Sequence, residues 1–246
     1  VEGYNQNRFR FLHKLLRNPW KKVCAAAECV TAPSPFLQEL IWKSDASVHC
    51  EIVPNGIETA AYLRGPKEKI VLTLCRLQQH KGVQDVVRSF STLAPEGWTM
   101  CVAGDGPYRP ELEKLASDCG VPEKIRFSGW IDSKSPALKE TLGSASVFVS
   151  MSRFESFGIS AAEAVASGCN TVLSDIPAHR FFASFGAALV PLDDAAALEA
   201  ALAQAMETPP ETPENLDALD WRGIVKKLEG LLLSAAKNAA ANRTGS

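Results

Sequence analysis

Two glutamates, Glu155 and Glu163, follow an apolar run at 145–150 whose β-branched and aromatic residues predict a buried parallel strand. The Ala-rich segment at 159–167 contains no Pro or Gly and predicts a helix, which Gly168 ends. Glu155 therefore lies in the loop before the helix, and Glu163 lies inside it. This arrangement suits a ligand that lies across a helix N-terminus, where free N–H groups bind anions. It equally suits one surface Glu followed by one helical Glu.

Arg76 and Lys81 are a second pair that could do chemistry, because both follow the apolar run at 70–74. A planar guanidinium and a mobile ammonium group can share the charge of a diphosphate. The alternative is that they are two solvated surface cations.

The elements that must position these residues alternate regularly from residue 69 onwards. Strands are predicted at 70–74, 98–103, 124–127, 145–150, 171–174 and 188–191. Helices are predicted at 83–93, 110–119, 137–142, 159–167, 178–184 and 195–206. Such alternation predicts an α/β fold with a doubly wound parallel, Rossmann-like sheet, in which ligands bind beyond the carboxyl ends of the strands.

The two ends of the chain differ from this pattern. Residues 8–17 predict a basic amphipathic helix, either packed with a solvated basic face or lying on a membrane surface. Ser34 and Pro35 predict the start of a helix that runs through Trp42, and a strand follows at 48–53. A last helix is predicted at 221–236, followed by a frayed tail.

Composition narrows the class of protein. The chain has 246 residues, 46% hydrophobic and 22% charged, with a formal net charge of −2. This is ordinary for one large or two small globular domains, and it gives no general nucleic-acid footprint. No apolar run approaches the ~20 residues of a membrane span, and no secretory signal is visible, although Val1 is not an initiator Met and leaves room for residues upstream. Seven cysteines without a Cys-x-x-Cys pair predict reduced thiols in a cytoplasmic protein, and four scattered histidines imply no metal cluster.

The central motif also carries a family resemblance. Glu155-Ser-Phe-Gly, followed by Glu163-Ala and then Ala166-Ser-Gly, resembles the signature of retaining glycosyltransferases of the GT-B fold, family 4. In that family the second Glu holds the ribose hydroxyls and the first lies by the donor sugar. The resemblance implies these roles for Glu163 and Glu155. It also implies that the loop amides around Phe157, Gly158 and Ile159 face sugar and phosphate.

Other blocks of the same family follow in order. Residues 74–82 resemble its Gly-Arg-Leu-x3-Lys-Gly motif, which implies that Arg76 and Lys81 bind the donor diphosphate. Cys75 replaces the usual Gly, and we expect its side chain to crowd the backbone there. Gly104, in a Gly-x-Gly-Pro turn, is implied to line the site. Trp130 and Ile131 occupy the nucleobase position, Trp130 to stack and Ile131 to contact through its backbone, unless Trp130 packs in the core or as a lid.

The resemblance covers roughly residues 30–230 and implies the C-terminal half of a GT-B architecture. Residues 1–64 would be the tail of an acceptor-binding N-terminal domain with the hinge, residues 65–219 the donor-binding domain, and 220–246 a terminal helix with its tail. The implied activity is hexosyl transfer from a nucleotide-diphosphate sugar, with retention. Arg76 and Lys81 would stabilise the leaving diphosphate, so no cofactor or metal is expected.

The expected partners are the donor and an acceptor that is a glycan, a lipid or a small molecule, with no nucleic acid. We expect a cytoplasmic protein, with peripheral contact to the inner face of a membrane as a variant of this expectation. Two alternatives stay open: a non-catalytic sugar-nucleotide-binding subunit, and a GT-B-fold epimerase. An epimerase would need a catalytic acid/base pair near the sugar, and the sequence shows no convincing one.

Overall fold

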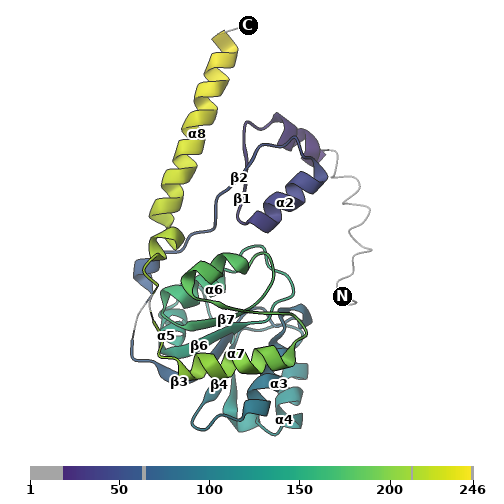
Figure 1. Ribbon diagram of the computed structural model, residues 1–246, viewed down its shortest axis with the longest axis vertical. Helices are drawn as coiled ribbons and strands as arrows, with labels where there is room; N and C mark the ends of the chain where they lie inside the picture. Colours follow the sequence, from purple (N-terminus) through teal and green to yellow (C-terminus); the bar gives the residue numbers. More distant parts are fainter. Residues whose placement is uncertain (1–18, 63–64, 212, 245–246) are drawn as a thin grey trace. The chain divides into compact units, whose positions relative to one another are not determined.

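The computed structural model describes residues 19–62, 65–211 and 213–244 (Figure 1). The basic amphipathic helix that we predicted at 8–17 lies outside these residues. The chain divides into two compact units, one formed by residues 56–220 and the other by the segments before and after it.

A six-stranded parallel sheet forms the centre of the 56–220 unit. Its strands are β3 (Glu68–Leu74), β4 (Thr99–Ala103), β5 (Ile125–Gly129), β6 (Ala145–Ser150), β7 (Asn170–Ser174) and β8 (Ala188–Val190). Their order across the sheet is β5-β4-β3-β6-β7-β8, and every neighbouring pair is parallel. The chain therefore begins with the central strand β3 and adds β4 and β5 outwards on one side. It then returns to the centre with β6 and adds β7 and β8 on the other side. This confirms the predicted doubly wound sheet, with its topological switch point between β3 and β6.

Helices cover both faces of the sheet because successive strand residues point to opposite sides. Val71 and Val147 pack in one hydrophobic cluster with α3 (Val83–Leu93), α4 (Arg109–Asp118) and α7 (Ala195–Glu207). Leu72 and Phe148, the next residues along, pack in the other cluster with α5 (Pro136–Ser144) and α6 (Ile159–Ala166). Figure 1 shows α3, α4 and α7 grouped on one side of the strands. Burial on both faces explains why the strands read as continuous apolar runs rather than alternating ones.

Short 3₁₀ segments complete this unit, and one of them corrects a prediction. They are η1 (Thr59–Ala61), η2 (Gln79–Lys81), η3 (Pro122–Lys124), η4 (Arg180–Phe185) and η5 (Leu216–Leu219). The α-helix that we predicted at 178–184 is wrong, because η4 occupies this place. Phe182 and Phe185 of η4 are buried side chains three positions apart, a spacing that the tighter 3₁₀ turn places on one side.

The 56–220 unit also begins earlier than the boundary that we expected between residues 64 and 65. The backbone N–H of Ile57 donates to the carbonyl oxygen of Leu219 at 2.9 Å, and the Thr59 hydroxyl donates to the Asp220 carboxylate at 2.6 Å. These bonds tie the first residues of the presumed hinge to the end of the same unit. The unit therefore closes on itself at 56 and 220.

The flanking segments form a small element of their own. Residues 19–26 are helical, and β1 (Val30–Ala32) and β2 (Cys50–Ile52) pair in parallel beside α2 (Pro35–Ser44). The Ser34 hydroxyl accepts from the Leu37 N–H at 3.4 Å, which confirms the predicted helix start.

The terminal helix α8 (Trp221–Thr244) continues past residue 236, where we predicted its end. The prediction of a frayed tail there was wrong, because the Ala-rich stretch that follows has high helix propensity. None of the helices in the described part of the chain has the length of apolar sequence needed to cross a bilayer. All seven cysteines are free thiols, as we predicted.

Candidate functional site

Lys81 and Glu155 meet at the switch point of the sheet. Lys81 lies in the loop after β3 and Glu155 in the loop after β6, and these two strands are neighbours. Lys81 Nζ donates to Glu155 Oε1 at 2.6 Å, and both side chains are about one-fifth exposed (17% and 20%). The sequence proposed both residues for the site, but their direct contact follows only from the pairing of β3 with β6.

The backbones of these two loops also touch. Gly82 has a φ of 70°, and a Cβ added there would come within 2.0 Å of the carbonyl oxygen of Met151. The Arg153 N–H donates to the carbonyl oxygen of His80 at 2.8 Å. The chain can therefore pass this closely only with Gly at position 82, and the contact fixes Lys81 relative to the second loop.

The turn at Gly104 supports the loop that carries Arg76. A Cβ on Gly104 would come within 1.9 Å of the Cys75 carbonyl oxygen, and one on Gly106 within 2.2 Å of the Leu77 carbonyl oxygen. These two glycines let the neighbouring backbone approach, whereas Arg76 itself is exposed. Cys75, which we expected to crowd the backbone at the phosphates, packs against the hydrophobic cluster under α3, and burial raises the pKa of its thiol to about 11.

Glu163 lies buried on α6, where its carboxylate has a partner that the sequence did not reveal. The Tyr62 hydroxyl donates to Glu163 Oε1 at 2.7 Å. Burial raises the pKa of Glu163, and the bond from Tyr62 acts in the opposite direction. The pKa of the Tyr62 phenol is raised by burial and by this carboxylate, so the phenol stays a donor. Tyr62 belongs to the segment that we read as hinge, and no motif marked it.

The N-terminus of α6 follows the loop at the same carboxyl edge of the sheet, after β6. Gly158 precedes the helix with a φ of 102°, a conformation that favours Gly. The Ala161 N–H already donates to the Gly158 carbonyl oxygen at 3.1 Å, so the N–H groups of Ile159 and Ser160 are the ones that this helix start offers to an anion. The Phe157 side chain is buried in the core, which leaves only its backbone for a ligand, whereas the Ile159 side chain is half exposed.

His179 lies in the turn between β7 and η4, and it is a buried polar residue. Its ring is buried beneath Gly158: a Cβ added to Gly158 would lie 3.4 Å from His179 Cδ2. His179 Nδ1 lies 3.1 Å from the carbonyl oxygen of Ser174. Burial lowers the pKa of His179, so the imidazole is neutral at neutral pH and forms part of the floor under the helix start.

Trp130 follows β5 at the same carboxyl edge and is 71% exposed, so the alternative of core packing is wrong. Ile131 is partly buried against the core cluster of α5 and α6. An exposed indole at this edge leaves its face available for stacking on a flat ring.

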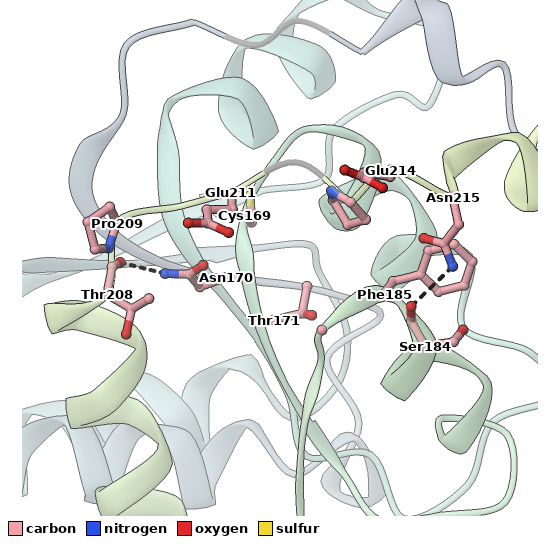
Figure 2. Close-up of a pocket in the computed structure, with 12 residues that line it drawn as sticks. Cys169, Asn170, Thr171, Ser184, Phe185, Thr208, Pro209, Glu211, Glu214 and Asn215 are labelled. Atoms are coloured by element: carbon pink, nitrogen blue, oxygen red, sulfur yellow. Dashed lines mark hydrogen bonds between the residues drawn. The ribbon is translucent and has the colours of Figure 1, made fainter.

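A hollow of about 570 Å³ lies elsewhere, at the amino end of β7. Asn170 and Thr171 of β7 line it together with the loop that carries Glu211 and Glu214 (Figure 2). Ligands of open α/β sheets bind at the carboxyl ends of the strands, and neither Lys81 nor Glu155 lines this hollow. We therefore place the candidate site at the carboxyl edge between β3 and β6.

Comparison with known proteins identifies the family of the chain. The family model described as "Glycosyl transferases group 1" matches residues 57–218, well over half of the chain. The chain belongs to this glycosyltransferase family. The matched residues nearly coincide with the 56–220 unit, which carries Tyr62, Arg76, Lys81, Glu155 and Glu163.

Individual glycosyltransferases are similar over this region. An alpha-monoglucosyldiacylglycerol synthase of Streptococcus pneumoniae is 28% identical over 168 residues, which are 60% of this chain and 37% of that enzyme. A lipopolysaccharide core biosynthesis glycosyltransferase of Rhizobium meliloti, LpsE, is 28% identical over 163 residues, which are 63% of this chain and 46% of that protein. The chain spans less than half the length of the curated relatives it matches.

Solved structures confirm the GT-B fold that the sequence resembled. Sucrose-phosphate synthase from Thermosynechococcus elongatus superposes with a TM-score of 0.79 at 22% identity, over 92% of this chain and 62% of that one. Anabaena Alr3699/HepE, in complex with UDP and glucose, gives a TM-score of 0.74 at 17% identity, over 95% of this chain and 68% of that one.

Proposed function

We propose that the 56–220 unit binds a nucleotide-diphosphate sugar, and that the chain acts within a retaining, family 4-like glycosyltransferase that transfers the sugar to an acceptor. The observation that carries this proposal is the Lys81–Glu155 pair at the switch point between β3 and β6. It brings a cation and a carboxylate to the place where open α/β sheets bind their ligands. The N-terminus of α6 lies beside this pair, because Glu155 is in the loop that leads into it.

The proposed roles follow from charge and burial. Arg76 and Lys81 face the diphosphate and stabilise the negative charge that grows on it as the bond to the sugar breaks. The first amides of α6 add to this stabilisation. Glu163 accepts hydrogen bonds from the ribose hydroxyls through Oε2, for which the described residues offer no partner. Glu155 orients the sugar beyond the diphosphate. Since side chains and backbone supply the positive charge, the proposal requires no metal.

In this proposal the acceptor binds to a part of a longer protein. The donor contacts lie in the unit described here, whereas the curated relatives are more than twice as long as their matched segments. We therefore expect the isolated chain to bind donor and to transfer sugar poorly. Efficient transfer by the purified chain to any acceptor would contradict this expectation.

Calorimetric titration with a nucleoside diphosphate and its sugar conjugate tests the two carboxylate roles. UDP and UDP-glucose are the first probes, because the Anabaena neighbour was solved with UDP and glucose. Glu163→Ala should weaken both ligands through lost charge-assisted hydrogen bonds. Glu155→Ala should weaken UDP-glucose and leave UDP nearly unchanged. Glu140→Ala, at an exposed position of α5, is the control. Equal losses for Glu155→Ala, or no loss for Glu163→Ala, would refute the assignment.

The cations are tested with the same titration. Arg76→Ala and Lys81→Ala should each weaken UDP by about 1.5–3 kcal/mol, the size of a charged contact, and should leave uridine nearly unaffected. Equal losses for UDP and uridine would remove the phosphate role. If the wild-type chain binds none of the UDP, GDP and ADP sugars, the proposed function fails as a whole.

A further inference from the structure

Arg153 joins three separate segments of the 56–220 unit. Its guanidinium makes a two-pronged ion pair with Asp193, Nη1 to Oδ2 at 3.0 Å and Nη2 to Oδ1 at 2.5 Å. Nη2 also lies 3.7 Å from Asp85 Oδ2. Asp85 belongs to the first turn of α3, and Asp193 lies between β8 and α7. We call these three residues the Arg153 clamp.

The clamp differs from an ordinary surface ion pair, which contributes little. Its guanidinium binds one carboxylate with both prongs and faces a second, a geometry that fixes direction as well as distance. Arg153 and Asp85 are each about one-third exposed (35% and 34%), whereas the Asp193 side chain is 71% exposed, so the distinction rests on the two-pronged geometry and the second carboxylate. Arg153 holds the pKa of Asp193 below its usual value and offsets part of the rise that burial causes in the pKa of Asp85.

Asp193, which pairs with Arg153, has an unfavourable backbone conformation. Its φ of 62° lies in the left-handed region, which is rare outside Gly. Such a residue persists where the surrounding structure determines it. The next residue, Asp194, caps α7 by accepting from the Ala197 N–H at 2.9 Å. The carboxylate that holds Arg153 therefore sits on the start of a packed helix.

The clamp acts on the loop that presents Glu155. Arg153 lies two positions before Glu155, and its N–H donates to the His80 carbonyl oxygen at 2.8 Å. His80 is next to Lys81, the partner of Glu155. The Ser152 hydroxyl donates to the Phe154 carbonyl oxygen at 2.8 Å, so the backbone between clamp and carboxylate is itself bonded. A side chain fixed at 153 thus restricts where the side chain at 155 can go.

We propose that Arg153 is a positioning residue for the donor sugar: with Asp193 and Asp85 it holds Glu155 beside Lys81 before the ligand arrives. This rests on the proposed function, in which Glu155 orients the sugar. The competing interpretation is that the clamp only holds the start of α7 against α3. Substitutions in the clamp would then change the stability of the fold and not the affinity for the donor.

Two substitutions separate these interpretations. Asp193→Gly removes the carboxylate and adopts the positive φ without strain, so the fold should keep its thermal stability. Arg153→Lys keeps the charge and loses the two-pronged geometry. Arg88→Lys, on the exposed side of α3, is the matched control. Each variant of the full chain is titrated with UDP and with UDP-glucose. Amide hydrogen exchange is measured over residues 151–158 and, for comparison, over α4.

We expect both clamp variants to bind UDP-glucose about tenfold more weakly, as when one charge-assisted contact loses its alignment, and to bind UDP nearly as the wild type does. Exchange should accelerate over 151–158 and stay unchanged over α4. Equal losses for both ligands, unchanged affinities, or unchanged exchange over 151–158 would overturn the proposal. A wild-type chain that binds no nucleotide sugar would instead refute the proposed function, and the exchange rates would still decide whether the clamp holds the loop.

Discussion

Tyr62→Phe is the substitution that most directly tests the environment of Glu163. It removes the hydroxyl that donates to Glu163 Oε1 at 2.7 Å and changes little else, because the ring remains. Glu163 is 9% exposed, so water replaces the lost donor only poorly. A hydrogen bond to a buried charged group contributes about 1.5–3 kcal/mol. We expect the free energy of unfolding at pH 7 to fall by about this amount.

The loss should depend on pH in a direction that the structure fixes. Burial raises the pKa of Glu163 above 4.5, its unperturbed value. Folding with the carboxylate ionised therefore costs stability, and this cost disappears as the pH falls through the raised folded pKa. Tyr62 reduces that cost, so its removal matters most at pH 7. Towards pH 4, below this raised pKa, the carboxyl becomes increasingly neutral in the folded protein, and the loss should shrink towards the about 0.5–1.5 kcal/mol of a neutral hydrogen bond.

Denaturant unfolding of the wild type and the variant at the two pH values measures this difference. Tyr108→Phe is the control, because the described residues offer no partner for its hydroxyl. The same loss for Tyr62→Phe at both pH values would show that the protonation state of Glu163 does not change between them, contrary to the reasoning from its raised pKa. No loss at either pH would show that the bond does not contribute.

Three further predictions concern the frame of the site and the chain as a whole. Gly104→Ala should lower the melting temperature by more than Gly120→Ala does. Both glycines have positive φ, but only a Cβ at position 104 would meet backbone, the Cys75 carbonyl oxygen at 1.9 Å. Gly120→Ala should cost about 1–2 kcal/mol, and an equal cost at both positions would contradict the prediction. Alkylation under native conditions should label the partly exposed Cys29 before Cys101, whose burial raises the pKa of its thiol, and the reverse order would contradict the described packing. Intact mass under non-reducing conditions should show no disulfide, and a stoichiometric one would overturn the free-thiol assignment.

The sheet and most of its helices could be predicted because both faces are buried. Strands such as β6 read as short unbroken apolar runs, and glycines such as Gly82 and Gly168 separate them from helices. The segment at 180–185 was harder, since its aromatic residues fit a helix of either pitch and only packing decides. The extent of α8 was underestimated, because the Ala-rich end was read as tail rather than as helix-forming sequence.

The candidate site residues could be proposed from the sequence, but their partners in the structure could not. Lys81 and Glu155 are separated by 74 positions, and their contact depends on the chain returning to pair β6 with β3. Tyr62 lies 101 positions from Glu163 in a segment without helix or strand pattern, so no periodicity pointed to it. Local sequence patterns indicate which residues face the core. Contacts between loops depend instead on the order of the strands in the sheet, which no local pattern specifies.

The contact between Lys81 and Glu155 has a consequence for how a diphosphate sugar would bind. In the free protein the two charges neutralise each other, so Glu155 is held in one place before any ligand is present. An arriving diphosphate brings more negative charge, and it can lie near Glu155 only if Lys81 stays between them. In the proposed function Lys81 would therefore screen the carboxylate from the phosphates and also set its position, while Arg76, which is exposed in the same loop, would add positive charge. Binding to such a site would cost little side-chain conformational entropy, because Lys81 and Glu155 already hold each other in place.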